Sequence, residues 1–306
     1  MTKPAGRRRR SAFAASLATM AMAIGMASIP AEAAPPPRVD YVALGDSYTA
    51  GTGAVEALRP ANTPCWQSHP GYVDVAGNTG RVTLVANAAC HGAVLSTASP
   101  RYDTTIYTPT VEQQLYALAS QGKISPDTEL VSITAGANDL GFSYVIGACA
   151  AYPQDVCAGV LQQATSPAAL QALHAGLVQT YAAIHSVAPR ARIAVMGYPL
   201  LFDPASAFAP IPPANQALIN QAAQALNSTL ATAAATANGL YQANTQYVDV
   251  SARFTGHAVN SADPWLQLNP NQPLADYNFH PNQAGHALGY AAALLAAVKP
   301  AQLARN

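Results

Sequence analysis

Short apolar runs rich in β-forming residues alternate along this chain with stretches of helical periodicity, and this alternation constrains the fold most strongly. The apolar runs span residues 39–44, 82–85, 130–134, 193–196 and 247–250. Helical signals occupy residues 111–120, 167–187, 213–237 and 283–298. Strands that alternate with helices form βαβ units, which place a parallel sheet between two helical layers. We therefore predict a three-layer α/β/α, flavodoxin-like fold with a central parallel sheet of about five strands.

The first residues have the features of an export signal. A basic segment ends in four arginines at residues 7–10, residues 11–30 are apolar, and Ala31-Glu32-Ala33 has the small-x-small form of a cleavage site. The prolines at residues 35–37 look like the start of a mature chain and argue against an uncleaved membrane anchor. We predict a signal peptide at residues 1–33, a single domain at residues 34–306, and a secreted, extracellular protein.

The charge of the predicted mature chain limits its partners. Removing residues 1–33 leaves 10 lysines and arginines against 14 acidic residues, a net charge of −4 with histidine neutral. A mildly acidic chain without a basic patch argues against a nucleic-acid partner. No other segment has the roughly 18 apolar residues of a membrane span, so we expect no stable membrane insertion. We expect a monomer.

Four cysteines, Cys65, Cys90, Cys149 and Cys157, lie in the predicted mature chain. An even number in an exported protein favours disulfides over free thiols. Three pairings are possible, and we expect the two that join cysteines close in sequence, Cys65–Cys90 and Cys149–Cys157. Because the chain has no CxxC motif and no histidines at ligand spacing, we expect no zinc or other metal site.

Groups suited to acyl chemistry follow several predicted strands. Open parallel sheets bind ligands beyond the carboxyl ends of their strands. Ser47 comes two residues after the first strand and should precede a helix, which suits either a nucleophile or a simple N-cap. A nucleophilic serine needs a base within hydrogen-bond reach, and His280, just before the last helix, belongs at the same edge.

Three groups could hold the oxyanion of a tetrahedral intermediate: the backbone N–H of Ser47, the backbone N–H of Gly92 and the side-chain amide of Asn138. Taken singly, Gly92 and Asn138 are equally well explained as turn residues.

Four blocks together resemble the GDSL (SGNH) hydrolase family, in particular its secreted actinobacterial esterase and lipase branch. They are residues 45–51 (GDSYTAG), 87–93 (NAACHGA), 136–139 (GAND) and 279–286 (FHPNQAGH). The resemblance implies that residues 34–306 form an SGNH hydrolase domain without cofactor. It would cleave small-molecule or lipid esters through an acyl-serine intermediate, with Ser47 as nucleophile, His280 as base, and Ser47, Gly92 and Asn138 as oxyanion donors. The four cysteines are also similar to those of that branch.

One position departs from the family pattern. The family usually has aspartate three residues before the histidine, where this chain has Tyr277, and the nearest acid is Asp276. We expect the Tyr277 backbone carbonyl to orient His280, with the Asp276 carboxylate as the alternative.

Two other functions fit parts of the sequence. A carbohydrate esterase that removes acetyl groups could stack sugars on aromatic residues of the long loops: Trp66, Tyr102, Tyr107, Tyr144 and Trp265. A secreted binding protein could keep the fold without catalysis. Retention of both Ser47 and His280 counts against the binding protein.

Overall fold

The computed structural model describes residues 38–54, 65–206 and 211–304. The predicted signal peptide at residues 1–33 lies outside them. The described chain contains five strands: β1 (Val39–Gly45), β2 (Val82–Asn87), β3 (Leu130–Thr134), β4 (Arg192–Met196) and β5 (Thr245–Val248). They form one sheet in the order β2-β1-β3-β4-β5, and every neighbouring pair is parallel. This confirms the predicted sheet.

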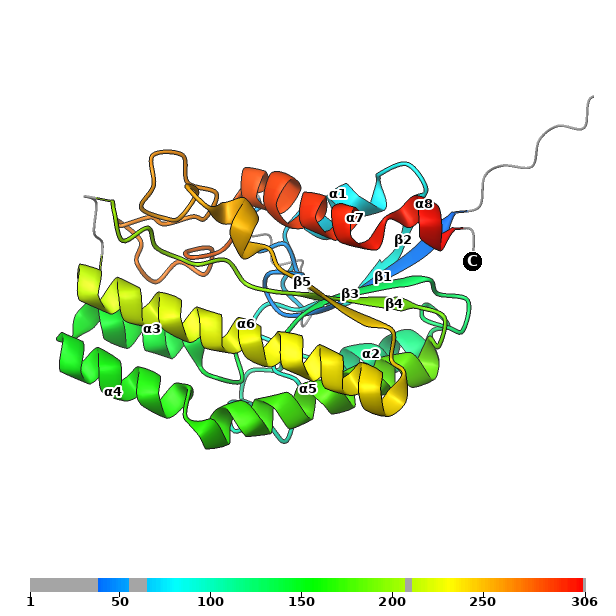
Figure 1. Ribbon diagram of the computed structural model, residues 1–306, viewed down its shortest axis with the longest axis horizontal. Coiled ribbons are helices and arrows are strands. Elements are labelled where there is room, and N and C mark those ends of the chain that lie inside the picture. The colour runs from blue at the N-terminus through cyan, green and yellow to red at the C-terminus, as the bar shows by residue number, and fades with distance from the viewer. Residues whose placement is uncertain (1–37, 55–64, 207–210, 305–306) are drawn as a thin grey trace, which may run out of the picture. The chain divides into compact units, whose positions relative to one another are not determined.

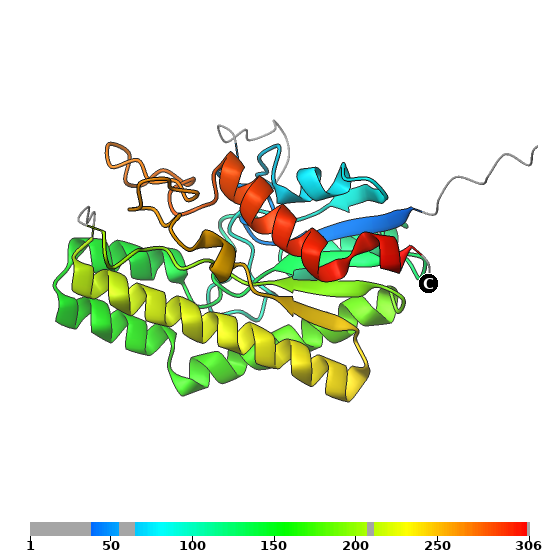
Figure 2. The same cartoon turned by 45° about the horizontal axis from the view of Figure 1, so that its top comes forward.

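Helices cover both faces of the sheet (Figures 1 and 2). One layer contains α2 (Val111–Ser120), α3 (Phe142–Ala151), α4 (Gln154–Ala164), α5 (Pro167–Val187) and α6 (Pro213–Tyr241). The opposite layer contains α1 (Tyr72–Gly77), the π-helical segment η2 (Gly285–Ala291), α7 (Ala292–Val298) and α8 (Pro300–Leu303). A 3₁₀ turn, η1 (Ser251–Phe254), follows β5. The three-layer α/β/α prediction is therefore confirmed.

The central strands are buried on both sides because helices pack on each face. All residues of β3 are buried, as are all residues of β1 except Asp40. Such strands have continuous apolar sequences instead of an alternating pattern, which is why they were visible in the sequence. The predicted start of α5 is also correct, since the Ser166 hydroxyl caps the helix by accepting from the Ala169 N–H.

No helix was predicted within residues 141–158, but this segment contains α3 and the start of α4. Because α3 has few polar residues, its sequence has little helical periodicity. Packing against α4 and α6, together with the Cys149–Cys157 disulfide between α3 and α4, stabilises it instead. α3 of this hairpin forms one wall of the cavity that reaches Ser47 and His280.

The strand order creates a switch point in the sheet. From β1 the chain moves outward to β2 and then returns to β3 on the other side of β1. Loops that follow β1 and β3 therefore diverge, and a crevice forms between them at the carboxyl edge. The residues that follow these strands are the ones singled out in the sequence.

Candidate active site

β1 delivers Ser47 to the carboxyl edge of the sheet. Gly45, the last residue of β1, has a φ of +131°, and a Cβ there would collide with the Thr134 carbonyl oxygen of β3. Glycine therefore permits this close approach. The Asp46 N–H donates to the same carbonyl at 2.9 Å, and Ser47 follows with its residue largely buried.

The expectation of a helix after Ser47 was wrong. Residues 46–54 form a series of turns in which the Ala50 N–H donates to the Asp46 carbonyl and the Thr52 N–H to the Ser47 carbonyl. Gly51 and Gly53 have φ values of +81° and +91°, which interrupt helical geometry. Ser47 is therefore presented by a tight turn, without a following helix.

The Ser47 side chain meets His280, which lies 233 residues further along the chain. The His280 Nε2 atom is 2.7 Å from the Ser47 Oγ atom. The loop that carries His280 precedes η2 and is held by two hydrogen bonds with Gln267: the Gln267 N–H donates to the His280 carbonyl at 2.8 Å, and the Phe279 N–H to the Gln267 carbonyl at 2.7 Å. The structure thus brings together the two residues that were predicted to meet.

The partner of the other imidazole nitrogen differs from both expectations. His280 Nδ1 lies 3.0 Å from the carbonyl oxygen of Asn278. The Tyr277 carbonyl accepts instead from the His280 backbone N–H at 3.1 Å, and the Asp276 carboxylate lies 4.0 Å from Nε2 of His91. Phe279 has a left-handed φ of +63°, which turns the chain so that the carbonyl two residues before His280 lies beside the ring.

The environment of His280 favours its neutral form. Burial, and then the nearby His91 imidazole, lower the pKa of His280 to about 3. A neutral ring that donates from Nδ1 to the Asn278 carbonyl has its lone pair on Nε2, directed at the Ser47 hydroxyl. This is the tautomer that can accept the Ser47 proton.

The three predicted oxyanion donors differ in their hydrogen bonds and in the cavity that each one lines. Within the described chain, the N–H groups of Ser47 and Gly92 have no hydrogen-bond partner, so both remain available. The Asn138 Nδ2 atom donates one hydrogen to the Ala93 carbonyl at 2.8 Å and keeps a second. Ser47 and Asn138 line one cavity with His280, whereas Gly92 lines an adjoining one, and His91 borders both.

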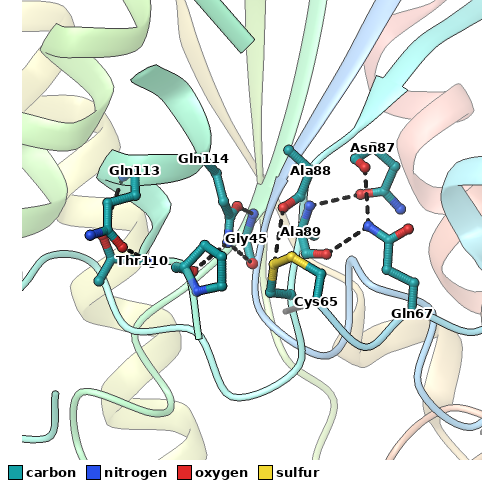
Figure 3. The surroundings of a disulfide bond; sticks show 11 residues. Gly45, Cys65, Gln67, Asn87, Ala88, Ala89, Thr110, Gln113 and Gln114 are labelled. Atoms are coloured by element: carbon teal, nitrogen blue, oxygen red, sulfur yellow. Dashed lines mark hydrogen bonds between the residues drawn. A yellow bond between two sulfur atoms is a disulfide. The ribbon is translucent and has the colours of Figure 1, made fainter. Parts of the chain in front are cut away.

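The segment that carries Gly92 is fixed against the end of β1. The Cys65–Cys90 disulfide anchors it, and the Cys90 N–H donates to the Gly45 carbonyl at 3.0 Å. Figure 3 shows the Gln67 amide beneath the same segment, where it donates to the Asn87 and Ala89 carbonyls at 3.0 and 2.8 Å. The described cysteines therefore form the two expected disulfides.

The larger substrate space is an apolar cavity of about 510 Å³ that reaches Ser47, His280 and Asn138. Its walls come from α3, α6, the loop after β4 and the loop before His280, and they include Phe142, Ile146, Leu201, Leu226 and Leu268. We call it the acyl cavity, because its apolar walls suit a hydrocarbon chain beside the serine.

No three histidine, cysteine or acidic side chains gather as a metal site anywhere in the described ranges. A helix long and apolar enough to cross a membrane is likewise not found in the part of the chain that the structure describes.

Comparison with known proteins decides the family. The pattern of the GDSL-like Lipase/Acylhydrolase family matches residues 43–288. The chain belongs to this family. A lipase from Streptomyces rimosus is 32% identical over 286 residues, which are 92% of this chain and 96% of the relative.

Solved structures agree with this assignment to the GDSL-like family. The crystal structure of an extracellular lipase from Streptomyces rimosus has a TM-score of 0.66 and 30% identity, covering 85% of this chain and 100% of that one. Phospholipase A1 from Streptomyces albidoflavus NA297 has a TM-score of 0.67 and 28% identity, with the same coverage. The predicted family, fold and enzyme class are confirmed: this family member is a carboxylic ester hydrolase.

Several residues that sequence analysis did not single out support this family's site. The Gln114 side chain of α2 bonds both backbone groups of Gly45, at 2.8 Å to its N–H and 3.0 Å to its carbonyl (Figure 3). Asp46 is buried and accepts from the Thr134 and Tyr198 hydroxyls, and burial raises its pKa to about 6. No local pattern marks Gln114, because its partner lies 69 residues away.

Proposed function

We propose that this hydrolase cleaves lipid esters by two-step acyl transfer, with Ser47 as nucleophile and His280 as general base. The observation that carries the proposal is the 2.7 Å contact between Ser47 Oγ and His280 Nε2. In the first step, His280 takes the Ser47 proton as Oγ attacks the ester carbonyl carbon. The same proton then passes to the departing alcohol, and the acyl group remains on Ser47.

In the second step, His280 deprotonates a water that attacks the acyl-serine. The carboxylic acid leaves, and the proton returns to Ser47. The Asn278 carbonyl takes the place of the carboxylate of a catalytic triad: it fixes the tautomer of His280 but stabilises the imidazolium less. The N–H groups of Ser47 and Gly92 and the Asn138 amide bind the oxyanion in both steps.

Lipid esters are the proposed substrates. An acyl cavity of about 510 Å³ exceeds what an acetyl group fills, and its walls are largely apolar. The relatives named lipase and phospholipase A1 point in the same direction. Removal of acetyl groups from polysaccharide is the less supported alternative, because a sugar-binding esterase has little use for a large apolar acyl site.

We also propose that residues 1–33 direct export and that the mature protein acts outside the cell as a monomer without nucleic acid. The signal-like sequence and the extracellular lipase among its relatives support export. The net charge of −4 supports the exclusion of nucleic acid.

The test is hydrolysis of p-nitrophenyl esters from acetate to palmitate by wild type, Ser47→Ala and Ser186→Ala. Ser186 is an exposed α5 serine whose hydroxyl bonds only within its own helix, so it controls for loss of a hydroxyl. We expect wild-type rates from Ser186→Ala and a loss of about 10⁴-fold or more from Ser47→Ala, as for removal of an activated nucleophile. Equal activity in all three proteins would disprove the role of Ser47. Fastest cleavage of acetate, with none of the longer esters, would favour the acetyl esterase.

A further inference from the structure

A second cavity lies against the same reacting groups. It has a volume of about 470 Å³ and shares His91 and Asp276 with the acyl cavity. Gly92, one of the proposed oxyanion donors, is also part of its wall. The His91 and His280 ring centroids are 5.5 Å apart, so this cavity begins one side chain away from the base.

The walls of this second cavity differ in chemistry from those of the acyl cavity. They include Trp66, Arg101, Tyr102, Asp103 and Tyr107, which offer charges, hydroxyls and ring faces. An ester has two halves that leave its carbonyl carbon in different directions. Because the acyl cavity suits the hydrocarbon half of the ester, the second, more polar cavity suits the alcohol half. We call this second cavity the alcohol cavity.

Arg101 supplies a guanidinium to the wall of the alcohol cavity. None of the described carboxylates lies within ion-pair distance of its guanidinium. The group packs against Gly141, the N-cap of α3, and its Cζ atom lies 5.9 Å from the Tyr144 ring centroid. It is thereby held near the loop of Asn138, and no described carboxylate neutralises it.

The two carboxylates of the alcohol cavity are engaged elsewhere. One oxygen of Asp103 accepts from the N–H and the hydroxyl of Thr105, at 2.8 and 2.6 Å. The Asp276 carboxylate faces His91 at 4.0 Å. An anion that enters the cavity can therefore bind the Arg101 guanidinium without displacing any described carboxylate from it.

We infer that the alcohol cavity receives a phosphate-bearing alcohol half and that Arg101 binds the phosphate. This rests on the proposed function and narrows its substrates to lipid esters whose alcohol carries a phosphodiester. Arg101 is a specificity-determining residue in this scheme, because a guanidinium matches phosphate oxygens in two-point geometry. It takes no part in proton transfer.

The experiment compares three butanoyl esters that share an acyl group: dibutanoyl phosphatidylcholine, dibutanoylglycerol and p-nitrophenyl butyrate, each as dispersed monomers. Wild type, Arg101→Gln, Arg101→Lys and Arg190→Gln are assayed on all three. Arg190 is an exposed arginine at the opposite, amino-terminal edge of the sheet and serves as the matched control.

We expect Arg101→Gln to lower kcat/KM about tenfold or more on the phospholipid, mainly through KM, and to change the two uncharged esters less than about twofold. Arg101→Lys should recover part of the loss, because it restores charge without the fork. Arg190→Gln should match wild type.

Two outcomes would overturn the inference. An equal loss on all three esters would mean that Arg101 only supports the fold, and no loss on any would mean that phosphate binds elsewhere or nowhere. Wild type inactive on p-nitrophenyl butyrate would instead overturn the proposed function itself. If wild type cleaves p-nitrophenyl butyrate and Arg101→Gln loses no activity on the phospholipid relative to the uncharged esters, the proposed function stands and only the role of Arg101 is removed.

Discussion

The Tyr48 hydroxyl donates a hydrogen bond of 2.7 Å to the Phe279 carbonyl, which joins the turn of Ser47 to the loop of His280. Each residue is the immediate neighbour of a proposed catalytic residue. The Tyr48 ring also packs against the His280 ring, with centroids 5.1 Å apart. Because Phe279 has a left-handed φ of +63°, a conformation that costs about 1–3 kcal/mol, this loop needs such support.

Tyr48→Phe should therefore lower kcat while leaving KM nearly unchanged. The ring remains, but the hydrogen bond, with a net contribution of roughly 1 kcal/mol, is lost, so we expect about a three- to tenfold fall in kcat. Steady-state kinetics on p-nitrophenyl butyrate, with thermal unfolding to check the fold, measures this. A rise in KM alone would instead place the hydroxyl in substrate binding.

Asp276→Asn should have little effect on turnover. The Asn278 carbonyl already accepts from His280 Nδ1, and the Asp276 carboxylate lies beside His91 instead. We therefore expect kcat within about threefold of wild type. Replacing a residue that orients the base typically lowers kcat by orders of magnitude, so the two cases are easily distinguished. A fall of several orders of magnitude in a folded protein would restore Asp276 as the orienting acid.

The catalytic residues and the hydrogen-bond partner of His280 show what the sequence could and could not predict. Ser47, His280 and Asn138 were recognisable because each lies at the carboxyl edge, where parallel sheets collect functional groups, and because the four blocks that include them together resemble the GDSL (SGNH) family. The partner of His280 was not predictable, because any of several adjacent carbonyls could face the ring. The choice depends on the φ of Phe279, a non-glycine residue with no sequence signal for positive φ.

The same limit explains the missed elements of the fold. Buried strands such as β3 are visible as short apolar runs, but α3 is apolar on most of its surface and lacks a polar face that would show a helical period. The Tyr48 and Gln114 contacts join residues far apart in the chain, at separations of 231 and 69. Only the folded topology brings such pairs together.

Acid should destabilise the protein partly through His286. This residue is fully buried, its Nδ1 accepts from the Tyr72 N–H and its Nε2 donates to the Thr52 carbonyl. Burial lowers its pKa to about 4 from the usual 6.5. Between these values the unfolded chain binds one proton more than the native state, so stability is lost as the pH falls from 6.5 towards 4, by up to about 3 kcal/mol.

Urea unfolding of wild type and His286→Gln at pH 7, 5.5 and 4.5 checks this. Glutamine can replace both hydrogen bonds but does not titrate. The free energy of unfolding of His286→Gln should depend less steeply on pH than that of wild type. Subtracting the two free energies at each pH cancels the contributions of His280 and Asp46, which both proteins share. Parallel pH profiles for the two proteins would contradict the assignment.

The length of the acyl group should be limited by the wall that α3 contributes. Gly147 lines the acyl cavity, and a Cβ at this position would meet no atom within 4 Å. A larger side chain can therefore enter the cavity without straining the helix, and replacing glycine within a helix even favours helix formation. Gly147→Leu should lower kcat/KM for palmitate and decanoate esters by about tenfold or more. The leucine side chain would occupy cavity space and so deny a long acyl chain apolar burial worth roughly 1.5–3 kcal/mol. The kcat/KM for the butyrate ester should stay within about twofold of wild type. Gly159→Leu is the matched control, since Gly159 is an exposed helical glycine of α4 that also has open space around it but does not line the cavity. The comparison uses the p-nitrophenyl series for both variants. A uniform loss over all chain lengths, or the same profile in both variants, would show that the hydrocarbon chain does not run along α3.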